Sequence, residues 1–298
     1  MTPSAGTIAP QRLGPTTAAG GSATDTGDRP SLRPRSATSL TRAAGLGLGI
    51  ALTWFSLLVL IPLAAVLVQA SAGGWSAYWD ALTSPQTLAA LRLTVGQAVF
   101  VTAVNVVMGT MIAWVLVRDQ FRGKQLLEVV IDIPFALPTI VAGLVLLSLY
   151  GPSSPLGLNW ANTRIAVFLA FLFVTLPFIV RTVQPVLLEL EQEVEEAAAS
   201  LGANRLTTFR LVILPSLAPA ITSGAALSFC RAISEYGSLI LLSGNLPYST
   251  EVASVRIMSS VEGDKLTDAA AVASILLVVA LVVIVVLDLI SRRVARYA

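Results

Sequence analysis

Long apolar runs separated by short charged segments dominate this chain. Six stretches contain no charged residue, at about residues 45–70, 93–117, 137–150, 165–180, 211–230 and 269–287. A membrane-spanning helix needs about 20 apolar residues, so the third and fourth stretches are short. Arginines flanking the fourth stretch can extend it by reaching the headgroups. The pattern predicts an all-α, polytopic transmembrane helical bundle of about six spans.

The composition of the 298-residue chain agrees with this prediction. Hydrophobic residues make up 55% and charged residues only 12%, and the mean hydropathy is +0.80. A soluble domain usually carries about 25% charged residues. The net charge of +2 is too small to suggest a nucleic-acid partner. There is no histidine and only one cysteine, Cys230, so a His-based metal site, an intrachain disulfide and a His general base are all excluded.

The polar N-terminal residues and the positive charges predict the topology. Residues 1–42 are rich in Ser, Thr, Pro and Gly and are expected to form a disordered cytoplasmic tail, followed by the transmembrane permease domain at 43–298. With the N-terminus inside, fourteen Lys and Arg residues fall on inside segments. Five fall outside, namely Arg92, Arg164, Arg231, Arg256 and Lys265. Both termini are therefore predicted to be cytoplasmic, with residues 181–210 as a cytoplasmic loop.

This loop contains a predicted amphipathic helix. From Val186 to Leu201, apolar residues recur every three or four positions, and glutamates mostly occupy the other side. Gly202 follows where a helix C-cap is expected, with a positive φ. Pro215 falls near the start of the next span, where the first turn tolerates proline. The loop is either a solvated connector or a helix whose alanines let another surface come close.

The spacing of this loop resembles a signature of permease subunits of bacterial ATP-driven importers. It reads Glu196-Ala197-Ala198, three residues, Gly202, nine residues, Val212, one residue, Leu214-Pro215, with valine in place of the usual isoleucine. The resemblance implies a type I importer permease fold and a coupling helix that docks on a separate ATPase chain. This chain has no Gly-x-x-x-x-Gly-Lys-Ser/Thr phosphate loop. No cofactor is therefore expected in it, and ATP and Mg are expected on the ATPase subunits.

Further stretches resemble the T-type permeases of sulfate/thiosulfate importers, over about residues 76–290. They include IDIPFALPTIVAGL, LPFIVRTVQPVL and ALSFCRAISEYGSLILLSGNLPYSTEVAS. The resemblance implies a subunit of the bacterial cytoplasmic membrane that is not itself an enzyme. It also implies a W-type sister permease as heterodimer partner, two ATPase subunits and an external sulfate-binding protein. A molybdate or other oxyanion importer is the alternative within this class. A secondary anion transporter is the alternative from another class, although the inverted repeat typical of such transporters is not seen.

Two charges at the outer end of the fifth span are candidates for the transport pathway. Arg231 and Glu235 are four residues apart, on one helical face. Charges within a membrane are costly and usually face a bundle interior or an aqueous path. The pair is either a structural ion pair or part of an outer gate in which Arg231 attracts the passing anion. Gly237, Gly244 and Asn245 follow in a glycine-punctuated loop that is expected to flex, and they are further gate candidates.

Overall fold

The computed structural model describes residues 42–190 and 192–295, and within these ranges all regular structure is helical. The helices are α1 (Arg42–Phe55), the π-helix η1 (Ser56–Leu60), α2 (Ile61–Ser71), α3 (Gly74–Thr83), α4 (Pro85–Arg118), α5 (Lys124–Ala136), α6 (Thr139–Tyr150), α7 (Arg164–Glu189), α8 (Gln192–Ser200), α9 (Arg205–Thr208), the π-helix η2 (Phe209–Ile213), α10 (Leu214–Ile233), α11 (Gly237–Leu242), α12 (Ala253–Glu262) and α13 (Leu266–Ala295). The predicted all-α fold is confirmed. The predicted tail, residues 1–42, lies outside the described residues except for Arg42.

The chain divides into two units, Met1–Thr53 and Trp54–Ala298, and the packing below is that of the second unit. Within residues 42–190 and 192–295, five helical segments are long and apolar enough to cross a membrane. They are Ala44–Ser71, Pro85–Arg118, Arg164–Glu189, Arg205–Ile233 and Leu266–Arg293. A sixth span arises if α5 and α6, which meet at an angle of 118°, are counted together.

Prolines cause the bend between α5 and α6. Leu137 is extended, with φ −85° and ψ 134°, as expected for a residue that precedes a proline. Pro138 then stands at the N-cap of α6. The predicted third span, at 137–150, therefore corresponds only to α6. Its charge-free pattern missed α5, which carries Glu128 and Asp132 and supplies the rest of the span.

The bent pair connects the two ends of α7. The carboxylate of Asp132 in α5 pairs with Arg181 in the second half of α7. Beyond α6, Trp160 stacks on Tyr150 with ring centroids 5.5 Å apart. The chain then enters the first turn of α7 at Arg164. Since α5 lies near one end of α7 and the chain after α6 leads to the other, the bent pair follows the length of α7 and is the candidate for the sixth span.

The fourth span is longer than its uncharged run predicts. Helix α7 continues past Arg181 to Glu189. The guanidinium of Arg181 pairs with Asp132 and also donates to Gln184 Oε1 at 2.8 Å. Pairing offsets much of the cost of a charge in apolar surroundings, so the helix continues through this position.

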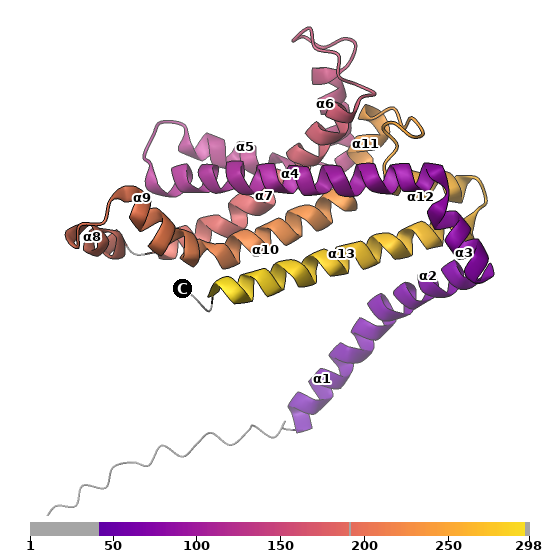
Figure 1. The fold of residues 1–298 in the computed structure, drawn as a ribbon, viewed down its shortest axis with the longest axis horizontal. Helices are drawn as coiled ribbons and strands as arrows, with labels where there is room; N and C mark the ends of the chain where they lie inside the picture. The colour runs from indigo at the N-terminus through magenta and orange to yellow at the C-terminus, as the bar shows by residue number, and fades with distance from the viewer. Residues whose placement is uncertain (1–41, 191, 296–298) are drawn as a thin grey trace, which may run out of the picture. The chain divides into compact units, whose positions relative to one another are not determined.

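Helices α4, α7 and α10 form the centre of the second unit, and α13 packs along α10 (Figure 1). Glycines let these helices approach closely. A Cβ at Gly109 of α4 would lie 2.7 Å from the Cβ of Ile179. A Cβ at Gly224 of α10 would lie 2.2 Å from the Oγ1 of Thr182. Such close packing is the main source of helix association in lipid, where apolar tails surround every helix.

The short helices α6 and α11 also cross through glycines. A Cβ at Gly143 would lie 2.6 Å from the carbonyl oxygen of Ser238. A Cβ at Gly237 would lie 2.1 Å from the Oγ1 of Thr139. The obstacle to Gly143 is backbone, which cannot rotate away as a side chain can. The two helices therefore have to separate if a side chain is added there.

We expect Gly143→Ala to destabilise the protein by about 1–3 kcal/mol, the usual cost of overpacking. The measurement is the thermal unfolding midpoint of the purified full chain in detergent. Gly96→Ala is the matched control, because Gly96 is also helical and nothing lies within 4 Å of its added Cβ. An unchanged midpoint for Gly143→Ala would contradict the close crossing of α6 and α11.

Candidate functional site

The predicted cytoplasmic helix is divided into two parts. Helix α7 runs to Glu189, Leu190 is extended with φ −73° and ψ 107°, and α8 begins at Gln192. The first residues of the predicted helix, from Val186, therefore belong to the long span, where Leu187 is fully buried. The apolar periodicity continues across the break although only α7 buries its apolar side chains, since Val194 and Leu201 after the break are exposed. Periodicity alone could not locate the break.

The end of α8 confirms the predicted glycine cap. Gly202 has φ +85°, the left-handed conformation that glycine adopts without a Cβ penalty. The N–H of Ala203 donates to the carbonyl of Ala198 at 3.0 Å, and the N–H of Gly202 donates to that of Ala199 at 2.9 Å. These two bonds form a Schellman motif, which fixes the direction in which the chain leaves the helix. Asn204 then caps α9, its Oδ1 accepting from the N–H of Thr207 at 2.8 Å.

The connection to the fifth span differs from the prediction. Pro215 lies in the first turn of α10, as predicted, but the helix does not begin there, because it is continuous over the 29 residues Arg205–Ile233. The π turn η2 joins α9 to α10, and within it the N–H of Leu214 bonds to the carbonyl of Phe209. Proline has no N–H to donate and crowds the turn before it. A π turn forgoes one regular helical bond next to this position, so the helix continues through the proline.

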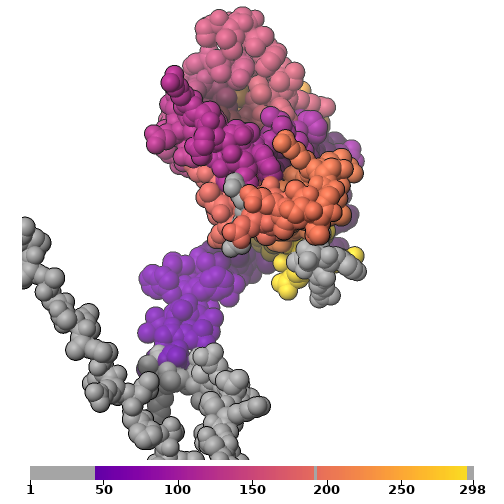
Figure 2. Space-filling model, turned by 90° about the vertical axis from the view of Figure 1, so that its left-hand side faces the viewer, coloured from indigo at the N-terminus to yellow at the C-terminus, as the bar shows by residue number. Residues whose placement is uncertain are grey.

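The signature residues face in different directions. Glu196 and Ala197 are exposed, whereas Ala198 is half-buried. Leu201, at the turn, is 90% exposed, and Leu206 and Leu211 nearby are also exposed. Figure 2 looks onto this end of the molecule and shows the segment from α8 to the start of α10, in orange, at the front. An exposed apolar surface rimmed by charge is typical of a protein contact.

An ion pair that sequence reasoning missed holds α8 to the bundle. The guanidinium of Arg118, at the end of α4, pairs with Glu195 and also donates to the carbonyl of Leu190 at 3.4 Å. Glu195 therefore turns inward rather than standing with the other glutamates in solvent. A cavity of about 410 Å³, lined partly by Trp114 and Phe209, lies beside the pair. The signal for this contact was Arg118 at the end of an apolar run, with no carboxylate three or four residues away on the same helical face.

Arg231 and Glu235 form the predicted ion pair, with 2.6 Å between Nη1 and Oε2. Glu235 lies beyond the end of α10 rather than on its face, and its side chain is only 1% exposed, against 26% for Arg231. The Oε1 of Glu235 also accepts from the N–H and the hydroxyl of Ser238, each at 2.9 Å. The carboxylate thus caps the start of α11 as well as neutralising Arg231. The pair fixes the turn between these two helices.

The other gate candidates make defined contacts in the structure. Gly237 is not in a loop, since it is the first residue of α11 and lies against α6. Gly244 has φ +70°, and a Cβ there would lie 2.2 Å from Asn162 Oδ1. Asn245 has φ +52°, and its Oδ1 accepts from the hydroxyl of Ser243 at 2.9 Å. These residues tie α11 to the connection that precedes α7.

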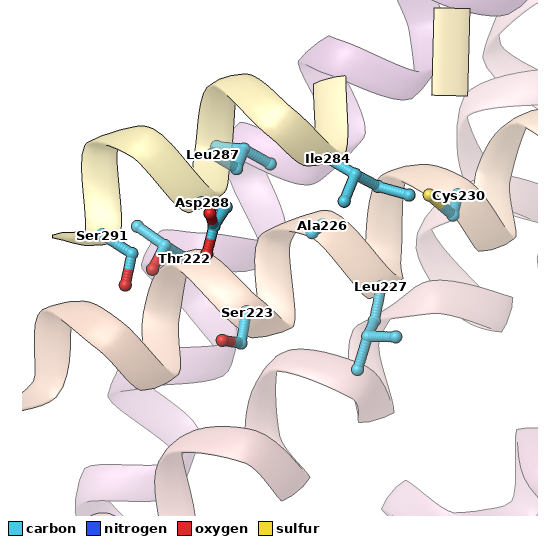
Figure 3. Close-up of a pocket in the computed structure, with 9 residues that line it drawn as sticks. All are labelled: Thr222, Ser223, Ala226, Leu227, Cys230, Ile284, Leu287, Asp288 and Ser291. Carbon is cyan, nitrogen blue, oxygen red and sulfur yellow. The ribbon is translucent and has the colours of Figure 1, made fainter. Parts of the chain in front are cut away.

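A groove of about 350 Å³ lies between α10 and α13. Figure 3 shows Thr222, Asp288 and Ser291 near one end of it and Leu227 and Cys230 near the other. Asp288 pairs with Arg292 at 2.7 Å. The groove is mostly apolar and its one ionised lining group is a carboxylate, so its chemistry does not suit an anion.

Comparison with known proteins identifies the family to which this chain belongs. The sequence profile of the family described as "Binding-protein-dependent transport system inner membrane component" matches residues 105–296, which include α8, the Gly202 turn and α10. The chain belongs to this family. It is accordingly a multi-pass protein of the plasma membrane and a permease component of a transport system.

Curated relatives of this permease extend the match over most of the chain. The chain is 41% identical over 258 residues to the "Sulfate transport system permease protein CysT" of Salmonella typhimurium, covering 84% of this chain and 93% of the relative. It is 42% identical over 256 residues to the protein of the same name from Synechocystis, covering 84% and 90% respectively.

Solved structures agree on the fold. A chain of a bacterial ABC transporter involved in the import of the acidic polysaccharide alginate matches with a TM-score of 0.70 at 18% identity, covering 84% of this chain and 95% of that one. The same kind of transporter, in complex with an alginate pentasaccharide-bound periplasmic protein, matches with a TM-score of 0.71 at 17% identity, covering 85% and 95%. The permease fold of ABC importers, expected from the sequence, is confirmed.

We expect Arg231→Gln to destabilise this permease more than Glu235→Gln. Losing Arg231 leaves a carboxylate at 1% exposure without its cation, and breaking a buried pair costs about 3–5 kcal/mol. Glutamine at position 235 still accepts from Ser238, and the partly exposed Arg231 still reaches water. The double mutant should regain part of the stability lost in Arg231→Gln. Thermal unfolding of the purified chain measures all three.

The control for this comparison is Arg292→Gln. Arg292 belongs to another i,i+4 pair, whose side chains are 70% and 51% exposed, and exposed pairs contribute about 0–1 kcal/mol. Equal shifts for Arg231→Gln and Arg292→Gln would mean that burial of Glu235 does not matter.

Proposed function

We propose that this chain is the transmembrane permease subunit of an ATP-driven importer for sulfate or thiosulfate, delivered by an external binding protein. Two relatives that cover most of the chain are both named sulfate transport system permeases. The choice of sulfate or thiosulfate as the anion is based on this similarity. The proposed coupling to an ATPase is based on the geometry of the chain itself.

The observation that carries the proposal is the segment from Glu196 to Pro215. It is a short helix that ends in a Schellman motif at Gly202, exposes apolar side chains and continues as a helix into the bundle. In the proposed function an ATPase subunit binds this exposed surface. Because the Arg118–Glu195 pair and the continuous helix to α10 both hold α8, its displacement is transmitted to the spans.

The proposed complex has further subunits. We propose a W-type sister permease as heterodimer partner, two ATPase subunits that bind ATP and Mg, and no catalytic residue or cofactor in this chain. The exposed apolar surfaces of α4 and α5, which include Val107, Met111 and Val129, are available to lipid or to the sister subunit. Both termini are cytoplasmic in this proposal, on the side of α8.

Arg231, Glu235, Gly237, Gly244 and Asn245 form the proposed outer gate. They lie at the end of the bundle remote from α8, where α10 ends and α11 packs on α6. Since α10 begins beside the coupling segment and ends at Arg231, one helix joins the proposed ATPase contact to the proposed gate. Movement of α10 would alter the contact between α11 and α6.

We expect Gly202→Asp to uncouple ATP hydrolysis from transport without lowering the amount of protein in the membrane. A non-glycine residue at φ +85° carries about 1–2 kcal/mol of strain, and the added carboxylate would stand beside the ATPase. The readout is the sulfate-stimulated ATPase activity of the reconstituted complex, which should fall roughly ten-fold. Gly202→Asn is the control, because asparagine and aspartate adopt positive φ about equally well and only aspartate adds a charge, so Gly202→Asn should retain more activity. If the Gly202→Asp complex kept the wild-type level of sulfate-stimulated ATPase activity, this segment would not be the coupling element.

The proposed orientation is tested with reporter fusions. A reporter active only in the cytoplasm should be active when fused after Ala298. Reporters active only outside should work near Trp79 and Ser260, in the connections at the end remote from α8. The physical reason is the excess of Lys and Arg on the proposed inside segments. An externally active fusion after Ala298 would reverse the topology.

A further inference from the structure

A polar cavity lies at the end of the bundle remote from α8. Its volume is about 430 Å³, and its polar lining comes from three elements. Helix α4 contributes Arg92 and Gln97, α7 contributes Arg164, and the connection after α11 contributes Tyr248. Gly96 opens the wall of α4 between the first two, and nothing lies within 4 Å of a Cβ placed there.

The cavity presents hydrogen-bond donors and no carboxylate. Within the described part of the chain, the guanidinium of Arg92 has no hydrogen-bond or ion-pair partner. Arg164 uses only its Nε, which donates to the carbonyl of Ser249 at 3.1 Å, so its terminal nitrogens remain available. The amide of Gln97 makes no hydrogen bond to the described residues, and its buried Oε1 is unsatisfied.

These two exposed arginines differ from Arg181 and Arg231. The guanidinium groups of Arg181 and Arg231 are each neutralised by a carboxylate. Arg92 and Arg164 face the same cavity without one, and two like charges held together create a local positive potential. A guanidinium offers a planar set of donors that matches the oxygens of a carboxylate, phosphate or sulfate group. The arrangement suits an anion with several oxygens that each accept hydrogen bonds.

We propose that this cavity is a low-affinity binding site for a tetrahedral, doubly charged oxyanion. Arg92 and Arg164 provide the charge, and Gln97 and the hydroxyl of Tyr248 provide further donors. The identification of the anion as sulfate or thiosulfate rests on the proposed function. In that function the site receives the anion at the outer mouth of the permease, before it enters the spans. The openness of the cavity to solvent and the small number of donors make the affinity low.

A lipid phosphate has the same chemistry as free sulfate. Val99 and Phe100, one turn along α4 from Gly96, are exposed apolar side chains, so lipid is close by. The experiment therefore has to separate an anion that comes from solution from a headgroup that comes from the bilayer.

The test measures whether sulfate protects a cysteine in the cavity. Gly96→Cys is introduced in a Cys230→Ala chain, and the full chain with its co-purifying subunits is reconstituted in nanodiscs of phosphatidylcholine. The rate of labelling by a neutral thiol reagent is measured with sodium sulfate and with sodium chloride at equal ionic strength. At sulfate ten times above its dissociation constant, labelling should be roughly ten-fold slower than in chloride.

Substitutions of Arg92 decide whether the protection comes from the proposed site. Arg92→Gln should abolish protection, and Arg92→Lys, which keeps the charge but not the planar donors, should retain part of it. Lys265→Gln is the control, since this cation lies at the same end of the bundle but does not line the cavity. It should leave protection unchanged. If sulfate protected the Gly96→Cys, Cys230→Ala chain equally well with and without Arg92→Gln, the proposal would be overturned.

The lipid arm repeats the assay in nanodiscs that contain phosphatidylglycerol. Protection that follows the content of phosphatidylglycerol and ignores sulfate would assign the cavity to a headgroup and overturn the proposal, as would no protection by either. Uptake of labelled sulfate by cells that lack their own permease is measured separately. Absence of uptake would reject the proposed function, while protection by sulfate would still establish the site, because labelling requires no transport.

Discussion

Neutralising charge without water is the constraint on which the arrangement of this chain depends. Three ion pairs each join a long helix to an element that departs from the bundle. They are Arg118–Glu195 between α4 and α8, Arg181–Asp132 between α7 and α5, and Arg231–Glu235 between α10 and α11. Pairing replaces the hydration that burial removes from Glu235, which is 1% exposed, whereas the side chains of the other two pairs remain 13–46% exposed. The same contacts that offset the cost of these charges therefore also position the bent span, the exposed helix α8 and the short helix at the other end.

Helix α10 connects the two functional regions proposed here. It is continuous with α9 beside α8, it packs on α4, α7 and α13, and it ends at Arg231. It contacts α7 closely at Gly224, although the interior Pro219 removes one of its helical hydrogen bonds. In the proposed function, a displacement at the exposed end moves the helix against α7.

The sequence predicted the features that depend on local chemistry. The charge-free runs located the spans, Gly202 has the predicted positive φ, and Arg231 and Glu235 pair as their spacing suggested. It failed where a distant residue changes the outcome. Arg181 was expected to end the fourth span because its partner Asp132 is 49 positions away in sequence. Pro215 was expected near the start of the fifth span. The sequence pattern could not show that a π turn lets the helix extend back past this proline to Arg205. The cytoplasmic side of the termini stays a prediction.

The π turn before Pro215 also sets an angle. A π turn holds one more residue than a regular helical turn, and each residue of an α-helix advances the chain by about 100° around the axis. Helix α9, which precedes Phe209, is therefore rotated by about 100° around the helix axis, compared with a helix that had a regular turn at this position. The π turn Phe209–Ile213 thus acts as an angular spacer, and the direction in which α9 leaves the span depends on the length of this turn as well as on the residues that follow it.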